Sequence, residues 1–336
     1  MPNKTINRAL SVAPMMAYTD RHFRRLVRFY SRRTLLYTEM VVTGTILNHK
    51  GETYLDDLLG LDELANPVAA QLGGDDPAEL AECAQICEQY GYDEINLNVG
   101  CPSPRVQKGQ FGVCLMGNPK RVANAIRAMS AAVRIPVTVK HRIGFDDQDS
   151  YVFMADFVKA CEDAGAQTFI VHARKAWLKG LNPAQNRSVP PLRYEEVYRL
   201  KHENPHLEVI INGGIESLDQ AEAQLAHVDG VMIGRAAYHN PEMFGNADSR
   251  FFNAADPEPM TEMETLARVD NYLTDQVEKG VRPSAVLKHC LGLFKGRKGS
   301  RLWRQHISAK IQGIEPERSL AEIYGTSIGA ESGSYL

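Results

Sequence analysis

A cysteine stands just beyond an apolar alternation in INLNVGCPSPRVQKGQFGVCL, which runs from Ile95 to Leu115. The alternation ends at Asn98, and the residues around Cys101 are too rich in glycine and proline to continue as strand or helix. A structural cysteine would more naturally lie inside the apolar run. The position therefore favours a reactive thiol at the end of a strand. Cys114, in the glycine-rich part of the same stretch, is interpreted as structural.

Polar and basic residues also stand where other short apolar runs end. They are Gln71, Lys140, Arg142, His172, Arg174, Lys175 and Asn212. If these side chains meet at one place, their donors and acceptors suit a polar heterocycle. To bring them together, the ends of several strands must lie at the same edge of one sheet.

Eight short apolar runs, rich in valine and isoleucine, predict parallel strands buried on both faces. They cover residues 9–14, 35–40, 67–72, 93–98, 136–141, 168–173, 208–212 and 229–234. Helical patterns with capping residues separate most of them, such as Asn118 before Pro119. This alternation predicts an α/β fold, a (β/α)8 TIM barrel. A doubly wound sheet is the alternative, but no glycine-rich dinucleotide fingerprint follows the first strand.

Active sites of such barrels lie at the C-terminal ends of the strands, and phosphate is bound after strands seven and eight. The seventh predicted strand ends in Asn212-Gly213-Gly214, and the eighth ends in Gly234-Arg235. Glycines allow a close backbone approach to an anion, and arginine supplies charge. A phosphate-bearing heterocycle is therefore expected at this end of the barrel, and flavin mononucleotide (FMN) fits both requirements.

The composition is that of an ordinary globular protein: 336 residues, 44% hydrophobic and 24% charged. No run of eighteen apolar residues and no signal-peptide core is present, so we expect a cytoplasmic protein without a membrane span. Six cysteines are too few for a disulfide framework in such a chain. Cys83 and Cys87, four apart in a helical pattern, are interpreted as buried small residues, with half a metal site as the alternative.

The pattern changes near Phe244. We expect a catalytic barrel domain over residues 1–245, a linker over 246–260, an all-helical domain over 261–325 and a flexible tail over 326–336. Between Lys288 and Lys310 there are seven Lys and Arg and no Asp or Glu, although the net charge of the chain is −3. This segment predicts a polyanionic partner. Its basic cluster comprises Lys295, Arg297, Lys298, Arg301 and Arg304, with Trp303 among them.

Taken together, several motifs resemble the flavin-dependent tRNA-dihydrouridine synthases over nearly the whole chain. The motifs are APMM–TD (13–20), YTEMV (37–41), QLGG (71–74), INLNVGCPS (95–103), VTVKHRIG (137–144), VHAR (171–174), NGGI (212–215) and DGVMIGR (229–235). HARKAWLKGL and NRSVPPL further resemble the A-type members, which act on D-loop uridines 20 and 20a.

The resemblance implies that reduced FMN passes a hydride to C6 of uracil and that Cys101 donates a proton to C5. A cysteine thiol is largely protonated at pH 7. The expected FMN-binding residues are Ala13, Pro14, Met15, Gln71, Lys140, His172, Asn212, Gly213, Gly214, Gly234 and Arg235. The expected contacts to uracil or tRNA are Asn98, Arg142, Arg174, Lys175, Arg187 and the basic cluster. Trp177, among basic residues of the loop after the sixth strand, could stack on a base or simply pack.

NADPH or NADH is the expected reductant, tRNA is the expected partner, no metal or protein partner is implied, and a monomer is expected. Two other functions compete with this interpretation. Another flavin barrel enzyme, acting on a small molecule, would share the phosphate site but would not explain the basic segment. A non-catalytic RNA-binding barrel would leave Cys101, Lys140 and His172 without a purpose.

Overall fold

The computed structural model describes residues 6–48, 52–314 and 318–328. It divides into two compact units. The first consists of Met1–Thr19 and Arg33–Gly234, and the second of Asp20–Arg32 and Arg235–Leu336. Each unit is therefore built from two separate stretches of the chain.

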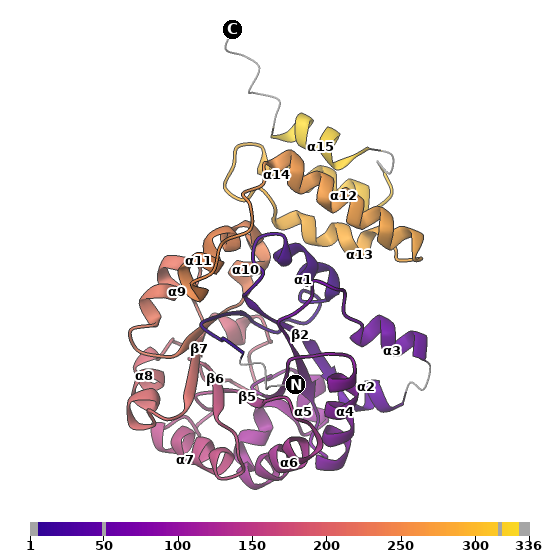
Figure 1. Ribbon diagram of the computed structural model, residues 1–336. Coiled ribbons are helices and arrows are strands. Elements are labelled where there is room, and N and C mark those ends of the chain that lie inside the picture. The colour runs from indigo at the N-terminus through magenta and orange to yellow at the C-terminus, as the bar shows by residue number, and fades with distance from the viewer. Residues whose placement is uncertain (1–5, 49–51, 315–317, 329–336) are drawn as a thin grey trace. The chain divides into compact units, whose positions relative to one another are not determined.

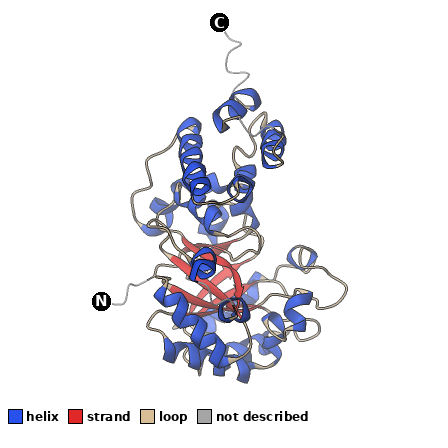
Figure 2. Ribbon diagram, turned by 90° about the vertical axis from the view of Figure 1, so that its right-hand side faces the viewer, coloured by secondary structure: helices blue, strands red, loops and turns tan. Residues whose placement is uncertain are grey.

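Eight parallel strands of the first unit close into a barrel (Figures 1 and 2). They are β1 (Leu10–Val12), β2 (Leu35–Val42), β3 (Val68–Gly73), β4 (Glu94–Val99), β5 (Val137–Arg142), β6 (Thr168–His172), β7 (Glu208–Asn212) and β8 (Gly230–Ile233). Each strand pairs with the next along the chain, and β1 pairs with β8. Every predicted apolar run overlaps one of these strands. The (β/α)8 barrel is confirmed, and the open doubly wound sheet is excluded.

Helices follow the strands and surround the barrel in Figure 2. In the first unit they are α2 (Thr43–Leu47), α3 (Glu52–Leu59), α4 (Pro77–Gln89), α5 (Pro104–Lys108), α6 (Pro119–Ala132), α7 (Tyr151–Glu162), α8 (Tyr194–Glu203) and α9 (Leu218–Gln224). Side chains of Asp76, Asn118 and Ser150 accept N–H bonds at the starts of α4, α6 and α7, and the helix start predicted at Asn118 is confirmed. Cys83 and Cys87 are buried on α4, as expected.

The second unit is helical. Its helices are α1 (Arg21–Arg28), α10 (Arg235–His239), α11 (Ala247–Phe252), α12 (Glu262–Glu278), α13 (Pro283–Leu287), α14 (Ser300–Ile311) and α15 (Leu320–Ser327), with a 3-10 turn at Lys288–Gly292. Its core is apolar and includes Leu266, Phe294, Trp303 and Ile323. The described residues contain no helix long and apolar enough to span a membrane.

The domain boundaries expected from the sequence differ from this division. The units divide after Gly234 rather than at residue 245, the expected linker contains α11, and α15 extends into the expected tail. Residues 329–336 of that tail lie outside the described residues.

Helix α1 follows the first barrel strand in sequence but belongs to the second unit. Its apolar side explains this placement, because Leu26 and the following Phe29 are part of the second unit's core. The Asp20 carboxylate caps α1 and contacts Lys288 Nζ at 2.7 Å and His289 Nε2 at 2.8 Å. These contacts attach α1 to the helical unit by both packing and charge.

Candidate active site at the C-terminal ends of the barrel strands

The loop after β4 holds Cys101 through backbone hydrogen bonds on both sides. Asn98 Oδ1 accepts from the N–H groups of Gly100 at 3.2 Å and Cys101 at 3.0 Å. The Cys101 carbonyl accepts from Val113 N–H at 3.1 Å. A side chain at Gly112, where φ is +64°, would collide with that carbonyl. The glycine-rich sequence therefore closes a tight loop around a partly exposed cysteine.

Lys140 lies near the C-terminal end of β5, opposite Asn98 in the strand register. Its ammonium donates to Asn212 Oδ1 at 3.0 Å. Burial and the charge of Arg142 lower the pKa of Lys140 to about 7, while Cys101 acts in the opposite direction. A partly buried lysine whose hydrogen-bond partner is a neutral amide is suited to an electron-rich ligand.

His172 is the last residue of β6. It pairs with Arg142 of β5 on one side and with Asn212 of β7 on the other. Burial and the charges of Arg142, Lys140, Arg174 and Arg187 hold its pKa well below the ordinary value. The imidazole is therefore neutral at neutral pH. Positive charge around it gives this end of the barrel a preference for an anionic or electron-rich ligand.

Arg142 is buried and binds three backbone carbonyls. Its guanidinium donates to Gly100 at 2.9 Å, to Lys175 at 3.1 Å and to Asn186 at 3.1 Å. These bonds tie the Cys101 loop to the loop after β6. The sequence suggested a substrate contact for Arg142, but its geometry favours positioning of the two loops.

Gln71 and Asn98 are buried and bonded to each other. Asn98 Nδ2 donates to Gln71 Oε1 at 2.8 Å, and Gln71 Nε2 donates to Asn96 Oδ1 at 2.7 Å. The two residues expected to contact flavin and uracil thus belong to one row of amides, in which Asn96 is a further member.

The glycines after β7 have backbone conformations that favour glycine. Gly213 has φ of +123° and Gly214 has φ of +71°. A side chain at Gly213 would also lie 2.9 Å from the His172 ring. The pair therefore forms a tight turn against His172. This turn is compatible with an anion site at the backbone N–H groups, but the positive φ angles and the His172 ring already explain the two glycines.

The remaining residues expected at the flavin are divided between the units. Ala13 is buried after β1, with its N–H on the Ile233 carbonyl at 2.8 Å, and Met15 packs on the same interior cluster. Pro14 and Gly234 are partly buried. Arg235 is exposed, begins α10 and belongs to the second unit.

The loop after β6 is held by its own polar side chains. Buried Asn186 accepts from Trp177 N–H at 2.7 Å and donates to the Trp177 carbonyl at 2.9 Å. Lys175 lies 4.1 Å from the Trp177 ring centre and 3.0 Å from the Asp149 carboxylate. Arg174 donates to the Pro190 carbonyl, whereas Arg187 is exposed. Lys175, expected at the tRNA, is thus engaged within the protein.

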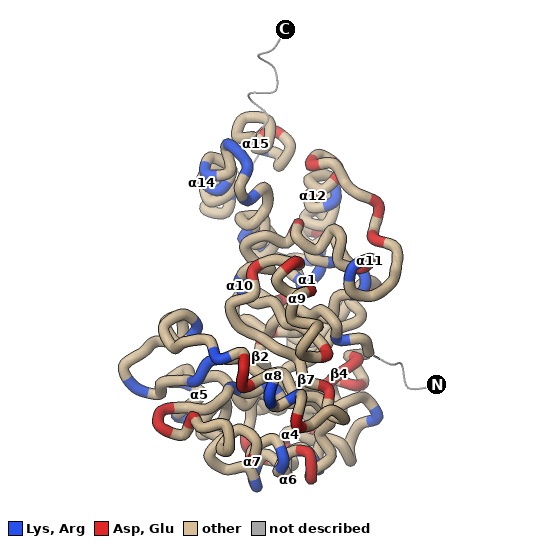
Figure 3. The backbone as a smooth tube through the Cα atoms, turned by 90° about the vertical axis from the view of Figure 1, so that its left-hand side faces the viewer, with Lys and Arg blue, Asp and Glu red and all other residues tan. Residues whose placement is uncertain are grey.

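The basic cluster of the second unit is exposed at all five positions. Figure 3 shows blue basic segments along α14. Two details differ from the sequence interpretation. Arg297 has an acidic partner, Glu262 of α12, and Trp303 is fully buried, with its indole N–H on the Cys290 carbonyl at 2.9 Å. Trp303 therefore supports the fold and is not available to stack on a base.

Residues 11–326 match the family model described as dihydrouridine synthase. The chain belongs to the dihydrouridine synthase family. It is 51% identical over 315 residues to the tRNA-dihydrouridine(20/20a) synthase of Escherichia coli (strain K12), covering 92% of this chain and 89% of that relative. The enzyme of that name from Vibrio cholerae is 47% identical over 326 residues, covering 95% and 98% of the two chains. The resemblance based on the motifs is confirmed.

A solved structure of a 2-naphthoyl-CoA reductase complex shares the fold. Its TM-score is 0.56 at 11% sequence identity, over 74% of this chain and 52% of the other. At this identity the likeness concerns architecture alone.

Sequence reasoning missed a buried polar group inside the barrel. Its buried members are Arg8, Tyr37, Glu94, Asn96, Thr138 and Thr168, and the partly exposed Glu208 bonds to Arg8 and Thr168. The signal available was the alternation Glu94, Asn96, Asn98, which places three polar side chains on one face of a strand. The partners of Arg8 lie 86 and 200 residues away, so no local pattern could reveal them.

Proposed function

We propose that this protein reduces the C5–C6 double bond of uridines 20 and 20a in the D-loop of tRNA to dihydrouridine. FMN is the bound cofactor and NADPH or NADH the reductant. The curated relatives carry the name tRNA-dihydrouridine(20/20a) synthase and match over most of both chains. The observation that carries the proposal is the placement of Cys101 beside Lys140, at adjacent strand ends of one barrel.

The residues at the strand ends fit a flavin. Lys140 is a donor beside an amide in a positively charged environment, and such a donor suits the N1 and C2 carbonyl edge of the ring. His172 and Gln71 supply further polar groups, and Ala13 to Met15 supply backbone and apolar surface. Gly213, Gly214 and Gly234 are proposed to lie at the phosphate. When bound, reduced FMN supplies the hydride that adds to C6 of uracil.

Cys101 is proposed to give its thiol proton to C5 of the uracil ring. Burial lowers the pKa of Lys140 and of Arg142, and Cys101 acts on both in the opposite direction, so the sulfur lies within electrostatic range of the two cations. The ring approaches a loop whose backbone is already fixed by Asn98, Arg142 and Val113. A positioned acid of this kind contributes on the order of 10²–10⁴-fold to rate.

The helical unit is proposed to bind tRNA phosphates through Lys295, Lys298, Arg301 and Arg304, all exposed. Contacts to phosphate give affinity and orientation but carry no sequence information. Arg174 and exposed Arg187 in the loop after β6 are proposed to contact nucleotides near the target. The enzyme then takes the base out of the folded tRNA, as enzymes acting on bases do.

Dihydrouridine mapping tests the proposal. In tRNA from cells that lack this protein, dihydrouridine should be absent at positions 20 and 20a and present elsewhere in the D-loop. The purified protein should be yellow, hold about one FMN per chain, and restore both positions with NADPH.

Free uridine separates the proposal from a small-molecule flavin enzyme. We expect reduction of tRNA and not of free uridine by the holoenzyme. Turnover of uridine with no change in tRNA would reject the tRNA substrate. Purified protein that is colourless and takes up no added FMN would reject the flavin.

A further inference from the structure

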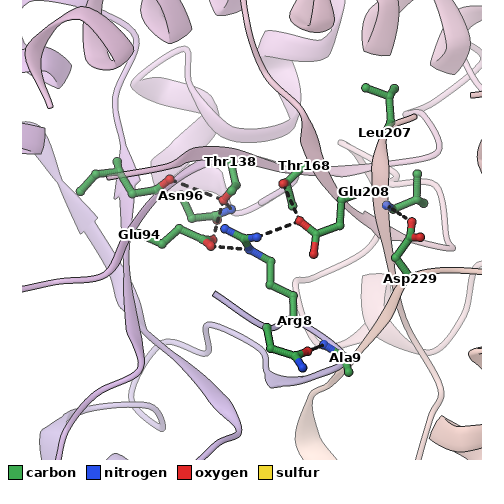
Figure 4. A network of polar contacts seen from close by, with 12 residues as sticks. Arg8, Ala9, Glu94, Asn96, Thr138, Thr168, Leu207, Glu208 and Asp229 are labelled. Atoms are coloured by element: carbon green, nitrogen blue, oxygen red, sulfur yellow. Dashed lines mark hydrogen bonds and ion pairs between the residues drawn. The ribbon is translucent and has the colours of Figure 1, made fainter. Parts of the chain in front are cut away.

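A one-directional row of hydrogen bonds lies in the barrel interior, and Figure 4 shows its first members, Glu94, Thr138 and Asn96. Thr138 Oγ1 donates to Glu94 Oε1 at 2.6 Å, and Asn96 Nδ2 donates to Thr138 Oγ1 at 2.8 Å. Gln71 then donates to Asn96, and Asn98 donates to Gln71. The row therefore runs from a carboxylate to the amide that holds the Cys101 loop.

The carboxylate at one end and the backbone N–H groups at the other require the same direction for every bond. Arg8 Nε donates to Glu94 Oε2 at 2.7 Å, and Tyr37 donates to Oε1 at 2.7 Å. A carboxylate paired with a guanidinium only accepts, so the single hydroxyl proton of Thr138 points at Glu94. The Thr138 oxygen is then an acceptor, and Asn96 must present its NH2 group to it.

The same reasoning passes along the amides. Because Asn96 uses its NH2 on Thr138, its carbonyl faces Gln71, which must donate. The Gln71 carbonyl in turn faces Asn98, which donates as well. The Asn98 carbonyl is left to face the N–H groups of Gly100 and Cys101. If the three amides turned over, the Asn96 carbonyl would face the lone pairs of the Thr138 oxygen, and the Asn98 NH2 group would face the N–H groups of Gly100 and Cys101.

We propose that Glu94 is a positioning residue that acts through Thr138, Asn96, Gln71 and Asn98 to set the place of the Cys101 thiol. The positioning itself concerns only this row, whereas its effect on turnover rests on the proposed function of Cys101. The amides of the row are buried, so solvent does not compete for these bonds.

The barrel contains a matched control for this row. Thr168 Oγ1 donates to Glu208 Oε2 at 2.8 Å, and Arg8 Nη1 donates to the same oxygen at 2.8 Å. Thr168 and Thr138 are thus buried threonines bonded to the two carboxylates that share Arg8. Figure 4 shows the carboxylates of Glu94 and Glu208 on either side of the Arg8 guanidinium. The Thr138 hydroxyl accepts from Asn96, the first amide of the row, whereas Thr168 is not part of the row.

The experiment compares Thr138→Val with Thr168→Val in the FMN-loaded protein. The rate of Cys101 alkylation by iodoacetamide is followed by peptide mass spectrometry, together with kcat and KM for tRNA. In Thr138→Val we expect an alkylation rate changed about threefold or more and kcat lowered roughly tenfold at similar KM, since small misplacements of reacting groups cost rate steeply. Thr138→Ser, which keeps the hydroxyl, should restore both values, and Thr168→Val should change neither.

Equal alkylation in Thr138→Val and wild type, or equal changes in the two valine variants, would overturn the proposal. Changed alkylation with unchanged kcat would uphold the positioning and reject Cys101 as the proton donor. If Thr138→Val does not fold, Glu94→Gln and its control Glu208→Gln decide in the same way. The neutral amide at 94 lets Thr138 either donate or accept, so the fixed orientation of the Thr138 hydroxyl at the start of the row is lost only in that variant.

Discussion

The part of the barrel interior around Glu94 and the part of the helical core around Trp303 bury different kinds of side chain. Around Glu94 the barrel encloses an arginine, a carboxylate and a row of amides that bond to one another. The helical core encloses Trp303, Phe294 and aliphatic residues, and its basic cluster stays exposed.

Buried polar groups cost stability unless every group is bonded, but fully bonded they impose one geometry. Apolar packing stabilises without such direction. In the barrel, polar burial fixes the backbone of the loop that carries Cys101. In the helical unit, apolar burial around Trp303 stabilises the fold, and the basic cluster is exposed.

The largest effect is expected at the loop that the polar interior holds. Cys101→Ala should lower the rate of tRNA reduction on the order of 10²–10⁴-fold while FMN content and tRNA affinity stay at wild-type values. Cys114→Ala, the other partly exposed cysteine, is the control and should remain active. Single-turnover reduction of tRNA measures both. Normal turnover in Cys101→Ala with loss in Cys114→Ala would reassign the acid.

Removing the largest side chain of the helical core should lower stability and tRNA affinity, whereas the change at Cys101 lowers the reaction rate alone. Trp303 is fully buried, stands edge-on to Phe294 with centroids 5.0 Å apart, and donates to Cys290. Trp303→Ala should destabilise this unit by about 3–5 kcal/mol, with tRNA affinity lost and FMN retained. Leu302→Ala, at a neighbouring exposed position, should cost far less. Urea unfolding followed by circular dichroism and flavin absorbance distinguishes the two units.

The comparison also shows which features can be predicted from the sequence. Strands such as 208–212 are predictable because buried parallel strands are short and continuously apolar, and helix starts because Asn118 and Ser150 are capping residues. The apolar face of α1 does not reveal which core it joins, so the sequence places α1 within the barrel domain. Trp303 is grouped with its basic neighbours in the sequence because a helix places buried and exposed residues side by side along the chain.

The strand-end residues are predictable because barrel topology brings all strand ends together. Asn98, Lys140, His172 and Asn212 lie on β4 to β7, and Lys140 bonds Asn212. Their support is not predictable, because the Arg8 to Glu94 pair joins residues far apart in the chain. A local sequence pattern predicts on which face of a strand a side chain lies, but its bonding partner depends on the tertiary structure.

The charge on Lys140 should give flavin binding a smaller, pH-dependent effect. Its pKa in the flavin-free protein is about 7, so the ammonium is charged below this pH and increasingly neutral above it. A hydrogen bond from a charged donor contributes about 1.5–3 kcal/mol, compared with about 0.5–1.5 kcal/mol for a neutral one, a difference of up to roughly tenfold in affinity. FMN affinity relative to Lys140→Met should therefore be highest near pH 6 and fall as the pH rises above 7. The ratio cancels the titration of the phosphate, and a ratio independent of pH would remove Lys140 from the flavin.

The smallest effect is expected at the exposed cations, where solvent screens each charge. Arg301 and Arg304 lie three residues apart on α14 and are both exposed. Removing one phosphate interaction should lower the salt slope of tRNA binding by roughly 0.7–0.9, so the double change to Glu should weaken binding strongly at low salt and little at high salt. Flavin reduction by NADPH should keep its wild-type rate.

A control with the same change in net charge separates local contact from general repulsion. Lys120 and Arg127 are exposed on α6 of the barrel, and reversing both to Glu gives the same difference in charge. Filter binding across a salt series should show a lower slope only for the α14 variant. Equal losses in both variants would mean that overall charge attracts the tRNA without contact at α14. An unchanged slope in both would assign phosphate binding to other cations, with exposed Arg187 in the loop after β6 as the next to reverse.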